Sequence, residues 1–165
     1  MNMHSFELKI VIEAAAGKIF AALTDPRWMA KWDPARWIVC DAHCGGRIRK
    51  RDEEDSLAEG EIVVYEPPMR FSYLWPVPTD PDEPEEDVFL VRYEFASEMH
   101  GKKSVLTMTA TGFPTEELAE REKNSWGGYY LEKIKKVAES MPEDEHAQLD
   151  PAKRPVRSGV GATAE

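Results

Sequence analysis

Two cysteines with a histidine between them are the residues that most resemble a metal site. Cys40 and Cys44 are separated by three residues, and His43 is one of these three. A structural zinc ion takes four ligands, and the chain has no second pair of this kind. The other histidines are scattered: His4, His100 and His146. We therefore predict no metal site and no cofactor, and two reduced thiols near a strand.

The remaining polar residues do not form a catalytic constellation at a recognisable spacing. No Ser-His-Asp or Cys-His arrangement of the known kinds is present, so the chain is not expected to be an enzyme. Arg47 and Arg49 share one face of a predicted strand. An inward-facing arginine could anchor a ligand carboxylate by two hydrogen bonds. The alternative is that both arginines point to water, as long charged side chains usually do.

A larger set of side chains could contact an apolar molecule. Most are aromatic, and the tryptophans and tyrosines also carry one polar group that could orient a ligand. The cluster of three tryptophans near residue 32 could be a lid over a pocket or a small core beneath a loop. For the whole set, plain core packing is the alternative. The residues predicted to line a pocket are Trp28, Trp32, Trp37, Tyr73, Trp75, Phe89, Tyr93, Met108, Trp126 and Tyr130.

The elements that would position these residues follow from hydrophobic periodicity. Alternation of apolar and polar residues predicts strands, over 6–12, 36–40, 47–50, 60–65, 69–75, 88–95 and 104–111. Helical spacing predicts two short helices and one long one, over 13–23, 26–32 and 115–141. Asp25 and Thr115 are the expected N-caps of the second and third helices. Strands followed by one long helix indicate the α+β class, with an antiparallel sheet of six to seven strands.

That order of elements predicts a cavity. A sheet of this size twists into a trough, and one helix of roughly 39 Å, at 1.5 Å per residue, cannot fill the trough with side chains alone. Gly127 and Gly128 interrupt the long helix, where glycine costs about 1 kcal/mol relative to alanine. We interpret both glycines as allowing close packing of the helix on the sheet.

Composition limits the partners. The formal net charge of −10 argues against nucleic acid and anionic membranes as partners. No apolar run is long enough to span a membrane, and the start of the chain lacks the features of a signal peptide, so a cytoplasmic location is expected. We expect one domain over 1–141 and a flexible polar tail over 142–165, with a solvated acidic loop over 76–87. A monomer and a homodimer are both compatible with the sequence.

Several short segments stand out along the chain: FAALTDP at 20–26 with Met29 and Trp32, GGR at 45–47, GEI at 60–62, EPPMRF at 66–71, LTMTATGF at 106–113 and SWGGYYLEKIK at 125–135. Together, and in this order, they resemble the SRPBCC (START-like) superfamily, and in particular the proteins related to the activator of the heat-shock-protein-90 ATPase. The resemblance implies a helix-grip fold whose relatives, among them polyketide cyclase-like proteins, bind apolar molecules between the helix and the sheet. The eukaryotic activators also carry an N-terminal chaperone-binding domain, which we do not expect here because the first strand starts at Phe6.

Three functions are therefore weighed. The first is binding of a small hydrophobic or amphipathic ligand, which the predicted cavity favours. The second is a co-chaperone or other protein-interaction module that stimulates a heat-shock-protein-90-type ATPase, with the acidic loop 80–87 as its candidate contact. The third is a cyclase-like or hydrolase-like enzyme acting in the pocket, which has the least support because no catalytic set is visible.

Overall fold

The computed structural model describes residues 3–77, 87–98 and 101–142. Its strands form one antiparallel sheet in the order β1-β7-β6-β5-β4-β3-β2. The strands are β1 (His4–Ile12), β2 (Trp37–Cys40), β3 (Arg47–Arg51), β4 (Leu57–Glu66), β5 (Arg70–Pro76), β6 (Val88–Glu98) and β7 (Lys103–Phe113). The predicted sheet of six to seven antiparallel strands is therefore confirmed, with seven strands.

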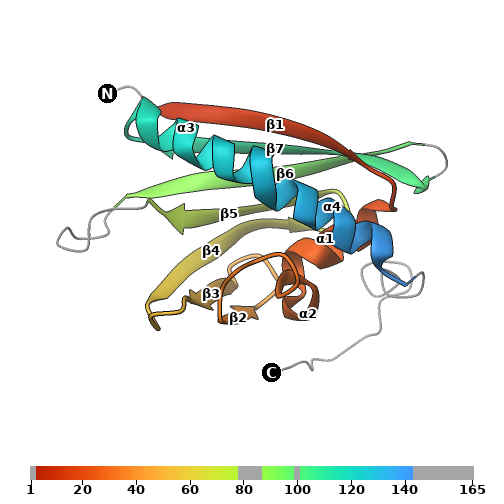
Figure 1. The fold of residues 1–165 in the computed structure, drawn as a ribbon, viewed down its shortest axis with the longest axis horizontal. Helices are drawn as coiled ribbons and strands as arrows, with labels where there is room; N and C mark the ends of the chain where they lie inside the picture. Colours follow the sequence, from red (N-terminus) through yellow and green to blue (C-terminus); the bar gives the residue numbers. More distant parts are fainter. Residues whose placement is uncertain (1–2, 78–86, 99–100, 143–165) are drawn as a thin grey trace.

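Two short helices follow β1, and one long helix follows β7. The helical segments are α1 (Ala16–Thr24), α2 (Pro26–Met29), α3 (Glu116–Ser125), the π-helical turn η2 (Trp126–Tyr130) and α4 (Leu131–Ser140). The last three are continuous and make up the long helix. Figure 1 shows the long helix lying diagonally across one face of the sheet, as the sequence predicted.

Local chemistry sets the starts of α2 and of the long helix. The Asp25 side chain accepts a hydrogen bond from the backbone N–H of Arg27 at 2.9 Å. Thr115 Oγ1 accepts one from the N–H of Leu118 at 3.1 Å, and two glutamates occupy the first turn of α3. Each cap satisfies an N–H group that has no partner within its helix. Both N-cap predictions are therefore confirmed.

The core lies between the long helix, α1 and the inner face of the sheet. Strand β6 shows the expected alternation, because Phe89, Val91, Tyr93 and Phe95 are all buried while Arg92 is exposed. The buried residues of β7 continue the same layer, and they include Leu106, Met108 and Ala110. From the helical side this layer is covered by residues of α1 and of the C-terminal half of the long helix, including Ile19, Phe20, Leu131 and Ile134.

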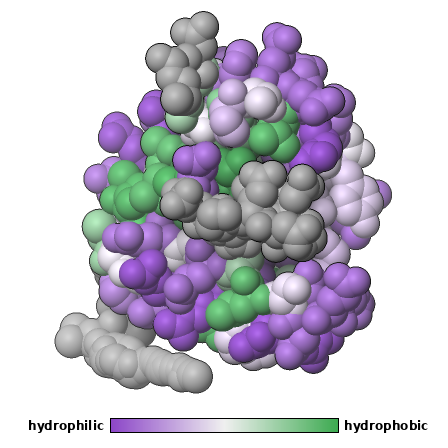
Figure 2. Space-filling model, turned by 90° about the vertical axis from the view of Figure 1, so that its left-hand side faces the viewer, coloured by the Kyte–Doolittle hydropathy of each residue, from purple (hydrophilic) through white to green (hydrophobic). Residues whose placement is uncertain are grey.

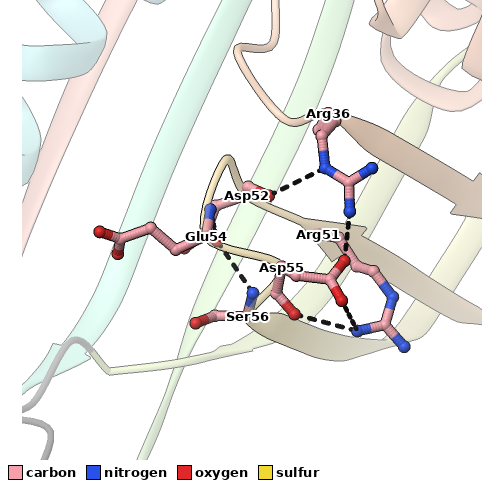
Figure 3. Close-up of polar contacts among 6 residues, drawn as sticks. All are labelled: Arg36, Arg51, Asp52, Glu54, Asp55 and Ser56. Atoms are coloured by element: carbon pink, nitrogen blue, oxygen red, sulfur yellow. Dashed lines mark hydrogen bonds and ion pairs between the residues drawn. The ribbon is translucent and has the colours of Figure 1, made fainter.

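The hairpin between β3 and β4 is tighter than expected. The sequence predicts strands over 47–50 and 60–65, but β3 continues to Arg51 and β4 already begins at Leu57. The Asp52 carboxylate accepts hydrogen bonds from the N–H groups of Glu54 and Ser56, both at 2.9 Å. Figure 3 shows this turn, in which Arg36 and Arg51 both form ion pairs with the carboxylate of Asp55. These contacts fix the turn over residues 52–56. The pairing of β3 with β4 therefore reaches Arg51 and Leu57, beyond the predicted strand ends.

Some predicted segments lie outside the described residues. These are residues 78–86 of the predicted acidic loop and residues 143–165 of the predicted tail. Within the described part of the chain, no helix is both long enough and apolar enough to cross a membrane.

Candidate ligand-binding site

A cavity of about 240 Å³ lies between the long helix and the sheet. We call it the inner cavity. Half of its lining residues are aromatic, and three are charged. It is lined by Trp32, Asp33, Pro34, Lys50, Tyr73, Trp75, Phe89, Val91, Glu122, Ser125, Trp126 and Tyr130. The predicted space between helix and sheet is therefore present, and side chains from both layers border it.

The π-helical turn positions two of the aromatic walls. In η2 the backbone N–H of Leu131 donates to the carbonyl of Trp126 five residues earlier, so the turn is wider than in an α-helix. The rings of Trp126 and Tyr130 lie 5.1 Å apart between centroids, and both line the inner cavity. Single π turns of this kind occur often at functional sites.

Trp32 is held rigidly below those two rings. Its indole N–H donates to the carbonyl oxygen of Ala22 in α1 at 2.7 Å, and the side chain is buried. Its ring centroid lies 5.9 Å from that of Trp126 and 6.3 Å from that of Tyr130. Such tilted aromatic pairs contribute to packing beyond the area they bury. Trp32 thus links α1, the loop after α2 and the long helix at the cavity wall.

Gly60 in β4 makes room for another wall, the Trp75 ring on the neighbouring strand β5. A Cβ atom at position 60 would lie 2.4 Å from Cε3 of Trp75 and 2.4 Å from the carbonyl oxygen of Leu74. Real side chains do not approach so closely, so only glycine allows the indole to lie flat over β4.

The cationic group of the cavity is Lys50 of β3. Its ammonium forms an ion pair with the Asp33 carboxylate. The Nζ atom also lies 5.8 Å from the centroid of the Trp32 ring and 5.1 Å from that of Trp75. The Asp33 side chain is 8% exposed and that of Lys50 is 21% exposed. A buried charge needs such a partner, because desolvation of an unpaired ion costs several kcal/mol.

Two tyrosine hydroxyls meet at the deep end of the site. The Tyr73 and Tyr93 oxygens are 3.4 Å apart, and both side chains are buried. Burial raises the pKa of both phenols well above the ordinary value, so both stay neutral. Tyr73 lines the inner cavity, whereas Tyr93 borders a separate void of about 10 Å³ beneath it.

The second carboxylate of the cavity comes from the long helix. Glu122 lies in α3 and lines the inner cavity beside Ser125. Burial raises the pKa of the Glu122 carboxyl, while the Arg121 charge and a hydrogen bond from Trp126 oppose this shift. Among the described residues, no cationic side chain lies within ion-pair distance of Glu122.

A second hollow of about 580 Å³ lies outside the inner cavity. We call it the outer groove. The turn described above, between β3 and β4, forms part of its wall (Figure 3). It shares four lining residues with the inner cavity, namely Asp33, Pro34, Lys50 and Trp75. These four side chains therefore separate the two spaces.

Figure 2 views the end of the molecule where β5 stops and β6 starts, and apolar patches lie there among hydrophilic ones.

Many of the side chains predicted to line a pocket come together around this site. Those that border the inner cavity are Trp32, Tyr73, Trp75, Phe89, Trp126 and Tyr130. Whether they contact a ligand stays a prediction. Tyr93 lies one layer deeper, as described above, and three other residues lie elsewhere.

The structure places Trp28, Trp37 and Met108 away from the inner cavity. Trp28 lies in α2 with Arg27 and the side chain of Lys31 over its ring, each at 5.7 Å from the centroid. Trp37 is on the edge strand β2 and is 41% exposed. Met108 is fully buried in the core. The three early tryptophans therefore do not form one lid over the inner cavity, because only Trp32 among them lines it.

The two arginines proposed as polar anchors also lie away from the inner cavity. Arg47 and Arg49 are exposed on the outer face of β3, and Arg49 Nε donates to the Glu59 carboxylate at 2.6 Å. Their shared face was predicted correctly, but it is the solvent face. Alternation along the strand then turns Ile48 and Lys50 inward. Sequence reasoning missed Lys50 as a lining residue. The apolar residue Ile48, two positions earlier, indicates that Lys50 lies on the inner face of the strand.

The cysteines form no metal cluster in the described residues. No group of three or more His, Cys, Asp or Glu side chains gathers there in a way that could hold a metal ion. Both cysteines are free thiols, and burial raises the pKa of Cys40 to about 12. His43 instead contacts the Asp41 carboxylate at 3.1 Å.

The two glycines of the long helix differ. A Cβ atom at Gly127 would lie 3.4 Å from the nearest atom of Leu8 in β1, whereas one at Gly128 would meet open space. The contact at Gly127 is an ordinary van der Waals distance, so close packing on the sheet does not account for the missing side chain there. The interpretation is also wrong for Gly128, which points to a different side of the helix.

The seven-stranded antiparallel sheet and the long helix define a helix-grip fold. A family model described as Activator of Hsp90 ATPase homolog 1-like protein matches residues 13–139. The chain therefore belongs to this family, a branch of the SRPBCC superfamily. A search of curated proteins found no match.

Solved structures share the fold at low sequence identity. A protein from Mesorhizobium loti is 18% identical with a TM-score of 0.68, and the match covers 84% of this chain and 99% of that one. A protein described as an HSP90 activator from Plasmodium falciparum is 23% identical with a TM-score of 0.67, covering 81% and 94%. The Aha1 dimer from Colwellia psychrerythraea is 15% identical with a TM-score of 0.64, covering 83% and 97%. At these identities the similarity establishes the fold alone.

Proposed function

We propose that this protein binds a small amphipathic molecule in the inner cavity. The observation that carries the proposal is a space with six aromatic walls and three charged groups that face the same volume. Binding sites for small molecules have this composition, with apolar walls and a few polar groups that orient the ligand. The lining residues come from β3, β5, β6, the long helix and the loop after α2, so the site depends on the complete fold.

The volume limits the size of the ligand. Pockets for drug-sized molecules measure roughly 300–1,000 Å³, and the inner cavity measures about 240 Å³. A molecule of one or two fused rings fits this space, whereas a larger one would also have to occupy the outer groove. Trp75 and the Asp33–Lys50 pair lie between the two spaces, so they would contact both parts of such a ligand.

A panel of small ring compounds, flavonoids, fatty acids and sterols tests the proposal by thermal unfolding. A ligand present at 100 times its dissociation constant stabilises the folded state by roughly 2.7 kcal/mol. We expect at least one class to raise the melting temperature and to change the fluorescence of the cavity tryptophans. Unchanged melting temperatures across the whole panel would contradict the proposal.

A pair of variants then locates the site. Ser125→Phe places a ring into the inner cavity from the long helix and should abolish the stabilisation. Asn124→Phe adds the same ring one residue away at an exposed position of the same helix, and it should leave the stabilisation unchanged. Equal responses of both variants would place the ligand elsewhere.

A second candidate function is stimulation of a heat-shock-protein-90-type ATPase. The family match and the solved structure described as an HSP90 activator favour it. The test is the ATPase rate of the chaperone with increasing amounts of this protein, with Ser125→Phe as a variant whose cavity is filled. Stimulation by both forms would support a role of the outer surface, and no stimulation at micromolar protein would remove this candidate.

A further inference from the structure

The charged groups of the inner cavity are not balanced. One cation, Lys50, faces two carboxylates, those of Asp33 and Glu122. The ammonium of Lys50 is already paired with Asp33 and lies near two indole rings, so it has little capacity left for an anionic ligand. The Glu122 carboxylate is partly desolvated and forms no ion pair among the described residues, so the Trp126 hydrogen bond and the charge of Arg121 are its only stabilising contacts there.

The carboxylates also make the inner cavity unfavourable for a negative charge on its tyrosines. Burial raises the pKa of Tyr130, and the nearby carboxylates of Asp33 and Glu122 raise it further. The same two carboxylates add to the raised pKa of Tyr73, again after burial. A negative charge on a tyrosine in this cavity is thus disfavoured, and a ligand carboxylate would meet the same repulsion.

The aromatic walls add to this preference. The faces of indole and phenol rings attract cations, because the ring quadrupole is negative on its faces. The structure already shows this for Lys50, which lies over Trp32 and Trp75. On the helical side, Trp126 and Tyr130 line the inner cavity together with Glu122, and no cation of the described residues lies over either ring.

Resting on the proposed function, we propose that the inner cavity prefers a ligand with a ring body and a protonated amine over one with a carboxylate. The amine binds the Glu122 carboxylate, and the rings of Trp126 and Tyr130 face the body of the ligand. Lys50 and Asp33 remain paired and form the opposite wall. The ligand class is therefore a small aromatic or cyclic amine.

Three probes of nearly equal shape test this preference by isothermal titration calorimetry: tryptamine, tryptophol and indole-3-propionate. Each is an indole with a two-carbon chain, which ends in an ammonium, a hydroxyl or a carboxylate. A hydrogen bond to the charged Glu122 is stronger than one between neutral groups, so we expect tryptamine to bind at least about tenfold more tightly than tryptophol. Indole-3-propionate should bind most weakly.

Variants of one helix identify the carboxylate. Glu122→Gln should weaken tryptamine binding about tenfold and leave tryptophol binding unchanged, because only the charge is removed. Glu120→Gln makes the same replacement of one carboxylate oxygen by an amide nitrogen at an exposed residue of the same helix, and it should change the binding of neither probe. Urea unfolding of each variant verifies that the fold is intact.

The outcomes separate the two proposals. Equal binding of the three probes, or tightest binding of indole-3-propionate, would overturn the charge preference and leave the proposed binding function standing. The charge preference would also be overturned if Glu122→Gln and Glu120→Gln weakened tryptamine binding equally. Absence of binding by all three probes would count against both proposals.

Discussion

The Nζ atom of Lys50 lies 5.1 Å from the centroid of the Trp75 ring. This contact joins β3 to β5 across β4, and it is possible because residue 60 of β4 has no side chain to stand between them. The Asp33 carboxylate completes the arrangement from the loop after α2. One ammonium thus holds together three separate segments that form the wall between the inner cavity and the outer groove.

Removal of the Lys50 charge should destabilise the protein markedly. Lys50→Met leaves the nearly buried Asp33 carboxylate without its counterion, and breaking such a pair costs about 3 kcal/mol. Urea unfolding at neutral pH measures the loss. The double variant Asp33→Asn/Lys50→Met removes both charges and should be more stable than Lys50→Met alone. If the stability losses of Asp33→Asn and Lys50→Met, measured singly, added up to the loss of the double variant, the two charges would not be coupled.

Substitution of Gly60 should disturb the site more than the fold. Gly60→Ala forces the Trp75 ring away from β4, and overpacking of this kind typically costs about 1–3 kcal/mol. We expect lower stability together with a changed Trp75 fluorescence spectrum and loss of ligand binding. Gly101→Ala is the control, because its turn is remote from Trp75. It should lower stability through its positive φ of 84° and leave the fluorescence unchanged.

The Tyr73–Tyr93 pair should make the protein sensitive to alkali. In the unfolded chain both phenols ionise near pH 10, whereas burial holds their pKa values above the ordinary value in the folded state. Above about pH 10 the unfolded state therefore binds fewer protons than the folded state, and stability falls as the pH rises. Below that pH both states are neutral and the pair makes no pH-dependent contribution.

The measurement is urea unfolding between pH 8 and pH 11 on the wild type and on Tyr73→Phe/Tyr93→Phe. The double variant should show a shallower decline above about pH 10. The single variant Tyr93→Phe leaves the buried hydroxyl of Tyr73 without its partner and should cost about 1–3 kcal/mol at neutral pH. Identical alkaline slopes for wild type and double variant would contradict this role of the pair.

The two glycines of the π-helical turn should respond in opposite ways. Gly127→Leu forces a bulky group against Leu8 and should destabilise the protein by about 1–3 kcal/mol. Gly128→Ala points to open space and should stabilise it by about 0.5–1 kcal/mol, because alanine loses less backbone entropy than glycine. Thermal unfolding of both variants tests this difference. Destabilisation by Gly128→Ala would show that the turn itself requires glycine at that position.

Periodicity was enough to predict the order of the elements because each one buries a regular face. Strand β6 alternates strictly, and the stripe from Trp126 to Met141 marks the buried side of the long helix. The π-helical turn was not predictable in this way, since one widened turn hardly changes the spacing of apolar residues. The boundaries of β4 also differed, because the Asp52 turn closes within five residues.

The charged part of the site was harder to predict than its aromatic part. A large aromatic side chain on the apolar face of an element must point into the space between helix and sheet. Hydrophobic periodicity alone therefore predicted that Tyr73, Trp75 and Trp126 lie at the cavity. Lys50 and Glu122 look like ordinary surface residues in the sequence. The inward position of Lys50 depends on Asp33, which lies 17 residues earlier in the chain. That of Glu122 depends on how the long helix is rotated on the sheet, with Trp126 one turn further along the same helix.

Strand β3 carries basic side chains on both of its faces, since its sequence is RIRKR. A shift of this strand by one residue relative to its neighbours would exchange its faces. A guanidinium would then stand where Lys50 now stands, and a guanidinium binds carboxylates through two parallel hydrogen bonds. The cationic group of the pocket wall therefore depends on the register of five residues, and a change in the length of the preceding loop that shifted this strand would replace the lysine by an arginine while the strand kept its own sequence.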